Sequence, residues 1–376
     1  MRTVVISDLH LGGRLGVDIL RNEGNREVLK DFIKGCDRLV LLGDTLELRH
    51  GPAHEALDSA LPVLQDIASV LKKKTEVVIV GGNHDHAVIA PWLDARRHDG
   101  QPAPLKNTEV ASADSGWISA RLADALAPAQ VTLGYPCVQI NSQVIAFHGN
   151  YLDRHIQVPT FERLAAGVMA KITGRPADQA VGADDYEAVL APMYSWTYEV
   201  AQQVPGGMGI GAHGVSSRAW KTLAGGSGHS PMRQRAAMVG FAGAVGLLNT
   251  AKLGPLRSDI SPQALRRAGI DAAAAAVAGL GLNEKHVLYG HTHRPGPLPG
   301  DDLDEWKITG GQQLWNTGSW VFEQHFLAKA PQGSPYWPGR AIEVIGEGEP
   351  VVHSLLNDRS ASEIVGDLQP HDEMFQ

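Results

Sequence analysis

Five short apolar runs in this chain each lead, directly or through a turn, into Asp, His or Asn, and this repeated pattern constrains the fold more than any other feature. The clearest run, Val77 to Val80, is β-branched and predicts a buried strand, which Gly81 and Gly82 end. Polar side chains this dense at a strand end are unfavourable to bury unless a metal or substrate supplies partners. The five groups are Asp8 with His10; Asp44; Asn83 with His84 and Asp85; His148; and His291 with His293.

Strands alternate with helices through the first half of the chain, which predicts the α/β class. Side chains at the carboxyl ends of adjacent strands converge on one crevice. Asn25 is expected to cap a helix that Gly35 closes. After residue 310, apolar runs follow one another without helices between them, which adds a second sheet. We therefore expect two packed mixed β-sheets, a sandwich, flanked by helices.

The pattern also predicts domain boundaries. Residues 1–155 and 286–358 carry the five runs and are expected to form the core. Residues 156–285 interrupt them and predict a mostly helical insert, a candidate cap or lid, with Ser261 and Pro262 starting one helix. Residues 359–376 are expected to be a C-terminal tail.

The residue types at the run ends are those of a metal site. Seven of them offer oxygen or nitrogen ligands without sulfur, which suits manganese first, with iron or zinc as alternatives. Cys36 and Cys137 stand far apart and are expected to be buried free thiols rather than ligands or a disulfide. Seven protein ligands are too many for one ion with an open position, but they suit two ions sharing a carboxylate. The candidate ligands are Asp8, His10, Asp44, Asn83, His148, His291 and His293.

In these blocks the sequence resembles the calcineurin-like metallophosphoesterases. Asp8-x-His10, Gly43-Asp44, Gly82-Asn83-His84-Asp85, His148 and Gly290-His291-x-His293 are similar, in order, to the five signature blocks of that family. The resemblance covers residues 1–155 and 286–322 and does not extend to the insert. It implies that one ion is held by Asp8, His10, Asp44 and His293, and the other by Asp44, Asn83, His148 and His291, so that Asp44 bridges.

The resemblance also implies a mechanism. A hydroxide shared by the two ions would attack phosphorus in line. His84 would donate a proton to the leaving oxygen or stabilise charge, and Asp85 would orient His84. Glu47 is left open between a supporting role at the site and a solvated loop residue. The histidines at 50, 54, 86 and 155 have no ligand slot and are expected to be structural.

A narrower resemblance concerns Asp153. The stretch from His148 to Asp153, and the later stretch from Trp315 to Trp320, look like bacterial phosphoesterases related to UDP-diacylglucosamine pyrophosphohydrolase. That enzyme carries Arg where this chain has His84. The difference favours a general phosphoesterase over a lipid-pathway substrate.

The insert emerges beside the expected metals and is placed to bind substrate. Its basic residues (Arg218, Lys221, Arg233 and Arg235 among them) could meet an anionic substrate, and the uncharged run 236–251 could pack on an acyl chain or a membrane surface. The alternative is an ordinary buried helix with solvated charges. The glycine-rich stretch 204–230 is expected to be a loop, and its dinucleotide-like letters at 209–214 lack the preceding strand and following acid that such a site requires.

The sequence therefore predicts a dinuclear-metal phosphoester hydrolase acting on a phosphorylated small molecule or lipid. The alternatives are a pyrophosphohydrolase for a lipid-linked or nucleotide-sugar substrate, a nucleotide phosphodiesterase, and a scaffold without catalysis. The net charge of −8 argues against long nucleic acid as a partner. Met1 and Arg2 lead straight into a strand without a secretory apolar core, so a cytoplasmic location is expected.

Overall fold

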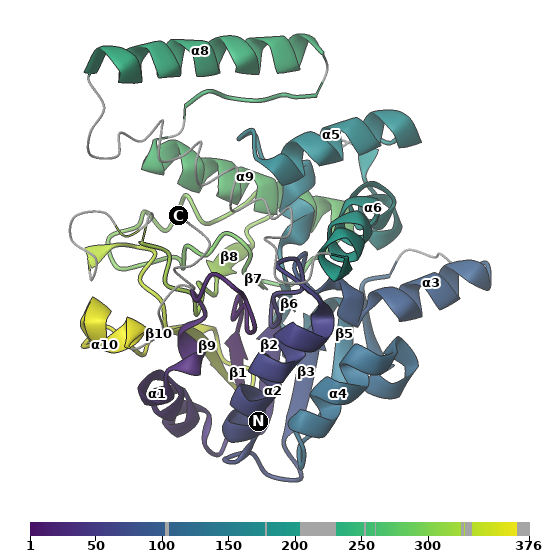
Figure 1. The fold of residues 1–376 in the computed structure, drawn as a ribbon, viewed down its shortest axis with the longest axis vertical. Helices are drawn as coiled ribbons and strands as arrows, with labels where there is room; N and C mark the ends of the chain where they lie inside the picture. Colours follow the sequence, from purple (N-terminus) through teal and green to yellow (C-terminus); the bar gives the residue numbers. More distant parts are fainter. Residues whose placement is uncertain are drawn as a thin grey trace.

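A ten-stranded mixed β-sheet positions the polar groups at the strand ends in this computed structural model (Figure 1). The structure describes residues 1–101, 105–176, 179–203, 231–251, 253–259, 261–324, 327 and 333–366, with the backbone alone at 231–239 and 262. The strand order is β10-β9-β1-β2-β3-β5-β6-β7-β8, and β4 pairs with β5. The strands are β1 (Arg2–Ile6), β2 (Arg38–Leu42), β3 (Glu76–Val80), β4 (Asn107–Ala111), β5 (Gln130–Gln139), β6 (Val144–Phe147), β7 (His286–Tyr289), β8 (Gln313–Asn316), β9 (Arg340–Ile345) and β10 (Val351–Ser354).

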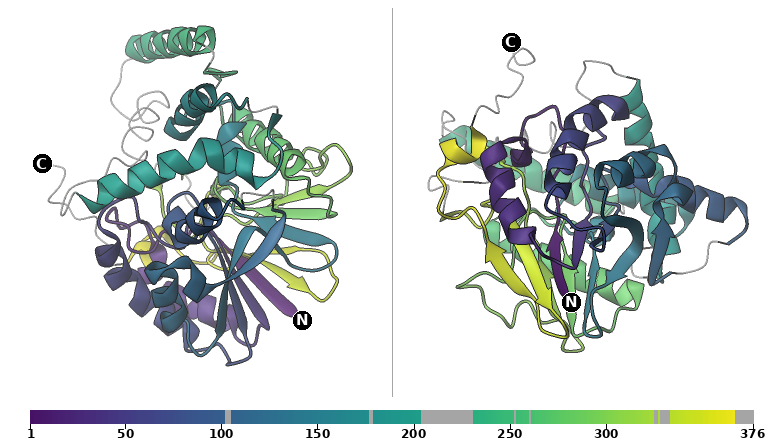
Figure 2. Two further views of the ribbon diagram at one scale, coloured as in Figure 1. Left: turned by 90° about the vertical axis from the view of Figure 1, so that its right-hand side faces the viewer. Right: turned by 90° about the horizontal axis from the view of Figure 1, so that it is seen from below.

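Helices lie on both sides of the strands, and the two further views separate the layers (Figure 2). Helices α1, α2 and α4 lie beside the first strands, whereas α5, α6, α8 and α9 gather at the other end of the molecule, with α8 outermost (Figure 1). The helices are α1 (Glu23–Ile33), α2 (Ala53–Ala68), α3 (Ala90–His98), α4 (Trp117–Ala125), α5 (Phe161–Thr173), α6 (Ala183–Gln202), α8 (Pro231–Thr250), α9 (Pro262–Leu280) and α10 (Ala361–Val365).

The long strand β5 joins two halves of the sheet. Its first residues pair in parallel with β3, and its last residues pair antiparallel with β6. A compact apolar cluster holds Val40 and Val78 from the first half together with Val144 and Leu288 from the second. Alternate residues such as Ile79 point the other way, into a larger cluster shared with the helices. The α/β class is confirmed, and the expected pair of sheets is present in part, as one hydrogen-bonded sheet whose halves pack together.

Among the described residues of 156–285, helices α5, α6 and α9 share the main core, whereas α8 has no residue in it. Buried residues of α6 and α9, such as Tyr186 and Ala273, belong to the same apolar cluster as the helices against the first strands. Ser261 caps α9 by accepting a hydrogen bond from the Ala264 backbone N–H, as its sequence predicts. Residues 204–230, including Arg218 and Lys221, lie outside the described residues, as do the side chains of Arg233 and Arg235.

One local detail differs from the sequence prediction, at the start of α1. Asn22, not Asn25, caps α1, because its side chain accepts from the Gly24 N–H while Asn25 lies inside the helix and donates to Ile19 and Ile364. The part of the tail that is described forms α10, and its Ile364 is buried. Cys36 and Cys137 are free and buried, as expected. In the described part of the chain, none of the helices has the length and apolar character needed to cross a bilayer.

Candidate metal centre

The carboxyl ends of five strands bring the seven candidate ligands together. The loops after β1 and β2 are joined by hydrogen bonds from the Asp8 and His10 backbone N–H groups to Gly43 O and Asp44 O, at 3.1 and 2.8 Å. The loops after β6 and β7 are joined in the same way, with the Gly290 N–H 2.7 Å from His148 O. These backbone hydrogen bonds fix the loops that carry Asp8, His10, Asp44 and His148 in the protein alone.

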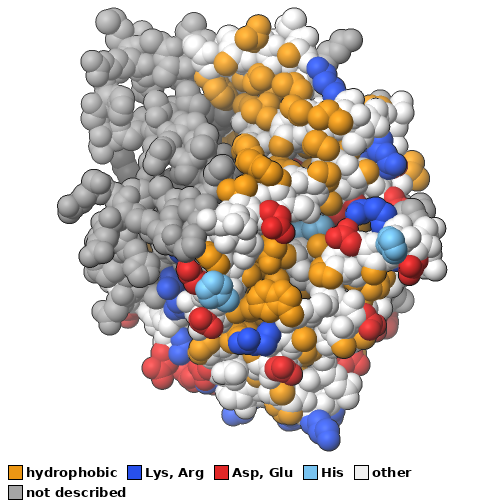
Figure 3. Space-filling model, turned by 45° about the vertical axis from the view of Figure 1, so that its right-hand side comes forward, with side chains coloured by type: hydrophobic (Ala, Val, Ile, Leu, Met, Phe, Trp, Pro, Cys, Tyr) orange, Lys and Arg blue, Asp and Glu red, His pale blue; other side chains and the backbone are white. Residues whose placement is uncertain are grey.

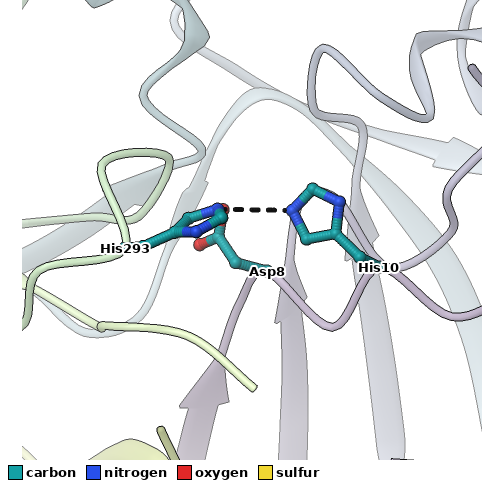
Figure 4. Close-up of side chains that lie close together, drawn as sticks. All are labelled: Asp8, His10 and His293. Atoms are coloured by element: carbon teal, nitrogen blue, oxygen red, sulfur yellow. Dashed lines mark hydrogen bonds and ion pairs between the residues drawn. The ribbon is translucent and has the colours of Figure 1, made fainter. Parts of the chain in front are cut away.

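One group consists of Asp8, His10 and His293 (Figure 4). The Nε2 atoms of His10 and His293 lie 3.3 Å apart, and Asp8 Oδ1 lies 3.3 Å from His293 Nε2. Asp44 Oδ2 is 3.7 Å from His10 Nε2, which adds a fourth ligand atom to this group. All of these side chains are buried or nearly so.

The second group consists of Asp44, His148 and His291, with Asn83 between them. Asp44 Oδ2 is 3.2 Å from His148 Nε2, and Asn83 Oδ1 is 3.3 Å from His148 Nε2 and 3.1 Å from His291 Nδ1. The same oxygen of Asp44 therefore faces both groups. Its other oxygen accepts the His84 backbone N–H at 2.8 Å, which fixes the carboxylate in this orientation.

Each of the four histidines is anchored by its outer ring nitrogen, so its inner nitrogen points at the centre. This arrangement, in which an acceptor fixes both the tautomer and the ring, is the usual environment of metal-binding histidines. The pairs are His10 Nδ1 with Glu47 Oε2 at 3.1 Å, His148 Nδ1 with Leu42 O at 2.9 Å, His291 Nε2 with Asp153 Oδ1 at 2.9 Å, and His293 Nδ1 with Glu323 Oε2 at 2.8 Å.

Five of the seven candidate ligands have a backbone conformation that side chains other than glycine rarely adopt. Among the described residues, they are the only non-glycine residues with positive φ. Asp and His tolerate this left-handed region better than most residues, but each still stores strain. Such strain gathers at functional sites, where the surrounding structure enforces it. The φ angles are 55° at Asp8, 46° at His10, 49° at Asp44, 67° at His291 and 57° at His293.

Two glycines allow the ligands to approach the backbone closely. A Cβ on Gly43 would overlap the His148 ring, and its φ of 83° also favours glycine. A Cβ on Gly82 would overlap the Asp44 carboxylate. Glycine is therefore required at positions 43 and 82 because any side chain there would overlap a candidate ligand.

The charges at this centre call for a cation. Burial raises the pKa of Asp44, but His148 and its other imidazole neighbours outweigh burial and hold that pKa well below its usual range. Burial lowers the pKa of His148, yet Asp44 outweighs it and raises the pKa to about 10. Without a metal ion, protonated imidazoles such as that of His148 therefore balance the negative charge of the carboxylates.

The donor set fits divalent metal ions. Asn83 Oδ1 faces the inner nitrogens of His148 and His291, and it also lies 3.2 Å from Asp44 Oδ2. Either a shared cation or the turned-over Asn83 amide, whose NH2 group would then donate to these atoms, satisfies this arrangement. Mixed carboxylate, amide and imidazole ligation suits manganese, iron or zinc. The two groups, which both include or adjoin Asp44, match the two ligand sets predicted from the sequence, and a third group, His10 with Asp44 and His84, overlaps them.

Glu47 is the residue that orients His84, and this corrects the role predicted for Asp85. Glu47 Oε2 lies 2.6 Å from His84 Nδ1. Asp85 instead accepts three backbone N–H groups, from Gly82 at 2.7 Å, Thr45 at 2.8 Å and Leu46 at 3.2 Å. Asp85 therefore holds the loops after β2 and β3 together. Adjacency in sequence pointed to the wrong carboxylate.

Arg49 is a site residue that no sequence pattern indicated. Its side chain is 1% exposed, and Nη1 lies 3.4 Å from His84 Nε2. Because His84 Nδ1 faces Glu47, this contact makes Nε2 an acceptor and the ring neutral. Burial, together with Arg49 and His10, lowers the pKa of His84 to about 3 despite the opposing charges of Glu47 and Asp44.

The remaining predicted residues divide between the site and the surrounding structure. Asp153 anchors His291, and Glu323, which the sequence analysis missed, anchors His293. His86 pairs with Glu187 at 2.9 Å, and His155 lies 2.8 Å from the Tyr186 hydroxyl, so both have structural partners away from the ligand atoms. The only sequence feature that could have indicated Glu323 is its position shortly after the stretch from Trp315 to Trp320.

Metal binding is expected to stabilise the protein measurably. A ligand present at about 1,000 times its dissociation constant adds roughly 4 kcal/mol to the unfolding free energy. Adding manganese to metal-free protein should therefore raise the melting temperature by roughly 5 °C or more. Differential scanning fluorimetry with and without chelator measures this, and Asp44→Asn protein should show little of the shift. An equal shift in both proteins would place the ions elsewhere.

The match to one family model agrees with this geometry. Residues 1–172 match the model of the calcineurin-like phosphoesterase family, a range that includes the blocks from Asp8 to His148 but not His291 and His293. Among curated proteins no relative matches. Two solved structures align at 12% identity, a cold-active protein-tyrosine phosphatase of a psychrophilic Shewanella species and a point mutant of a cold-active protein tyrosine phosphatase. Each alignment covers 95% of this chain and 78% of the other, with TM-scores of 0.31 and 0.33.

Proposed function

We propose that this chain, whose residues 1–172 match the calcineurin-like phosphoesterase family, hydrolyses phosphoesters with two divalent metal ions, manganese being the first candidate. One observation carries the proposal: four histidines anchored from outside aim their inner nitrogens at two groups that share Asp44. When bound, the ions would supply a water of lowered pKa and positive charge for the phosphoryl oxygens. His10, His293, Asp8 and Asp44 would hold one ion, and Asp44 with the second group would hold the other.

The side chains beside the metal groups suggest how the substrate is handled. His84 and Arg49 lie next to each other, within reach of Asn83, one of the candidate ligands. We assign Arg49 to neutralise charge on the phosphoryl group, because its Nε atom is buried and has no hydrogen-bond partner among the residues that the structure describes. His84, whose ring is oriented by Glu47, would take up a proton and then donate it to the leaving oxygen. Alternatively, it would stabilise negative charge without transferring a proton.

The proposed activity has a direct test. Purified protein loaded with manganese is expected to hydrolyse an aryl phosphate or an aryl phosphodiester, followed by release of nitrophenolate. Chelator should remove the activity and added metal should restore it. Absence of turnover on both substrates, with two ions bound per chain, would contradict the proposal and support a scaffold without catalysis.

A pyrophosphohydrolase for a lipid-linked or nucleotide-sugar substrate is a second candidate. Apolar side chains on the insert favour it: Ile172 of α5 is 72% exposed and Leu247 of α8 is 73% exposed. Figure 3 shows hydrophobic side chains gathered over the upper part of one face, where α5, α6 and α8 lie in Figure 1. Peripheral membrane contact through the insert and a cytoplasmic location both stay predictions.

A further inference from the structure

The first turn of helix α5 reaches from the insert to the candidate active site. Thr160 caps this helix by accepting the Arg163 N–H, which places Glu162 two residues after the cap. Glu162 Oε1 accepts a hydrogen bond from Arg49 Nη2 at 3.1 Å. The Glu162 side chain is only 12% exposed, so the two charges meet largely out of solvent. This contact joins residues 113 positions apart.

Arg49 stands between Glu162 and the candidate metal ligands. While Nη2 faces Glu162, Nη1 lies 3.4 Å from His84 Nε2 and 3.1 Å from the side-chain amide of Asn83. The guanidinium is therefore shared between the insert and the site. A carboxylate that neutralises it on one side reduces the positive charge that it offers on the other.

Glu162 is charged in this position. Burial raises the pKa of Glu162, but Arg49 outweighs burial and the pKa lies below its usual value. It adds to an acidic surrounding, because the ligands and the groups that anchor them are already rich in carboxylates. Those carboxylates are Asp8, Asp44, Glu47, Asp153 and Glu323.

We propose that Glu162 is a positioning residue that sets substrate specificity: by neutralising Arg49 it favours singly charged phosphodiesters over doubly charged phosphomonoesters. This inference rests on the proposed phosphoesterase function. A monoester dianion carries one more negative charge than a diester at the same phosphorus. Glu162 repels that extra charge, and the Arg49 guanidinium that would attract it is already partly neutralised. A diester has an uncharged ester group in place of the extra charge.

The test is the ratio of kcat/KM for an aryl phosphodiester to that for the corresponding aryl monoester, both with manganese-loaded protein. Glu162→Gln keeps the shape and the acceptor oxygen but removes the charge. It is expected to shift the ratio toward the monoester by roughly tenfold, because one charge–charge interaction near the phosphoryl group is lost. Glu162→Asp keeps the charge and should retain the wild-type ratio. Glu199→Gln, an exposed change on α6, is the matched control for the insert.

Equilibrium binding gives a readout that does not depend on turnover. Calorimetry should show inorganic phosphate binding about tenfold more tightly to Glu162→Gln than to wild type, while diethyl phosphate binding changes little. An unchanged ratio and unchanged phosphate affinity in Glu162→Gln, with wild-type metal content, would overturn the role of Glu162. Failure of the proposed function would look different, since the wild type itself would then turn over neither substrate.

Discussion

Asp44→Asn is expected to lower kcat/KM for phosphoester hydrolysis by at least about 10³-fold, because one carboxylate oxygen serves both metal groups. Asp44 Oδ2 lies 3.2 Å from His148 Nε2 and 3.7 Å from His10 Nε2. An amide in its place offers one neutral oxygen, and it cannot balance the charge of two cations. The protein would then lose both the water of lowered pKa and the positive charge that stabilises the phosphoryl oxygens.

Metal content distinguishes this effect from simple misfolding. Elemental analysis of Asp44→Asn protein should find fewer than two ions per chain, with circular dichroism like that of the wild type. Asp66→Asn is the matched control, because Asp66 forms ion pairs with Arg26 and Lys30 on the protein surface, away from the site. Wild-type metal content and activity in Asp44→Asn would rule out Asp44 as the shared ligand.

His84→Asn is expected to lower kcat by roughly 10²–10⁴-fold while both ions stay bound, since the ring adjoins the ligands without belonging to either group in the proposed assignment. The partners of the ring are Glu47 at 2.6 Å and Arg49 at 3.4 Å. Substrates with poor leaving groups should lose the most activity if His84 donates a proton, because a good leaving group departs without one.

A series of phosphoesters with leaving groups of increasing pKa separates the two roles of His84. A loss that grows along the series identifies a proton donor, and a uniform loss identifies charge stabilisation. The neutral ring in the present structure, with Nε2 facing Arg49, means that proton donation requires His84 to take up a proton after substrate arrives. Loss of metal in His84→Asn would instead show that the residue is a ligand.

The sequence predicted the convergence of the ligands because that convergence follows from topology. Strands β1, β2 and β3 are parallel neighbours, so Asp8, Asp44 and Asn83 must emerge at the same edge. Residue type and strand position were sufficient for this part of the site, and no knowledge of side-chain rotamers was needed.

The residues that support the ligands were harder to predict, because their positions depend on loop conformation. Asp85 follows His84 directly, yet the turn aims its carboxylate at the backbone of the neighbouring loop. Glu47 reaches the same ring from 37 residues away. Arg49 and Glu162 meet across an even longer separation, through packing of α5 that no local pattern records.

Helix capping shows the same limit on a smaller scale. Asn22 and Asn25 are both suitable cap residues, and both are near the start of α1. The structure uses Asn22 as the cap, because Asn25 is drawn inward by carbonyl groups of Ile19 and Ile364. Ile364 comes from the far end of the chain, so its contribution is invisible in a local window.

The left-handed backbone conformation at five candidate ligands affects how related proteins would evolve and how this protein could be stabilised by engineering. Each such residue costs roughly 1–3 kcal/mol of folding free energy, so together they are comparable with the whole net stability of an ordinary domain. A lineage freed from selection for hydrolysis would gain stability by placing glycine or asparagine at positions 8, 10, 44, 291 and 293. Homologues that have lost catalysis should be recognisable by such replacements. Libraries of variants selected for stability alone should accumulate substitutions at the same positions.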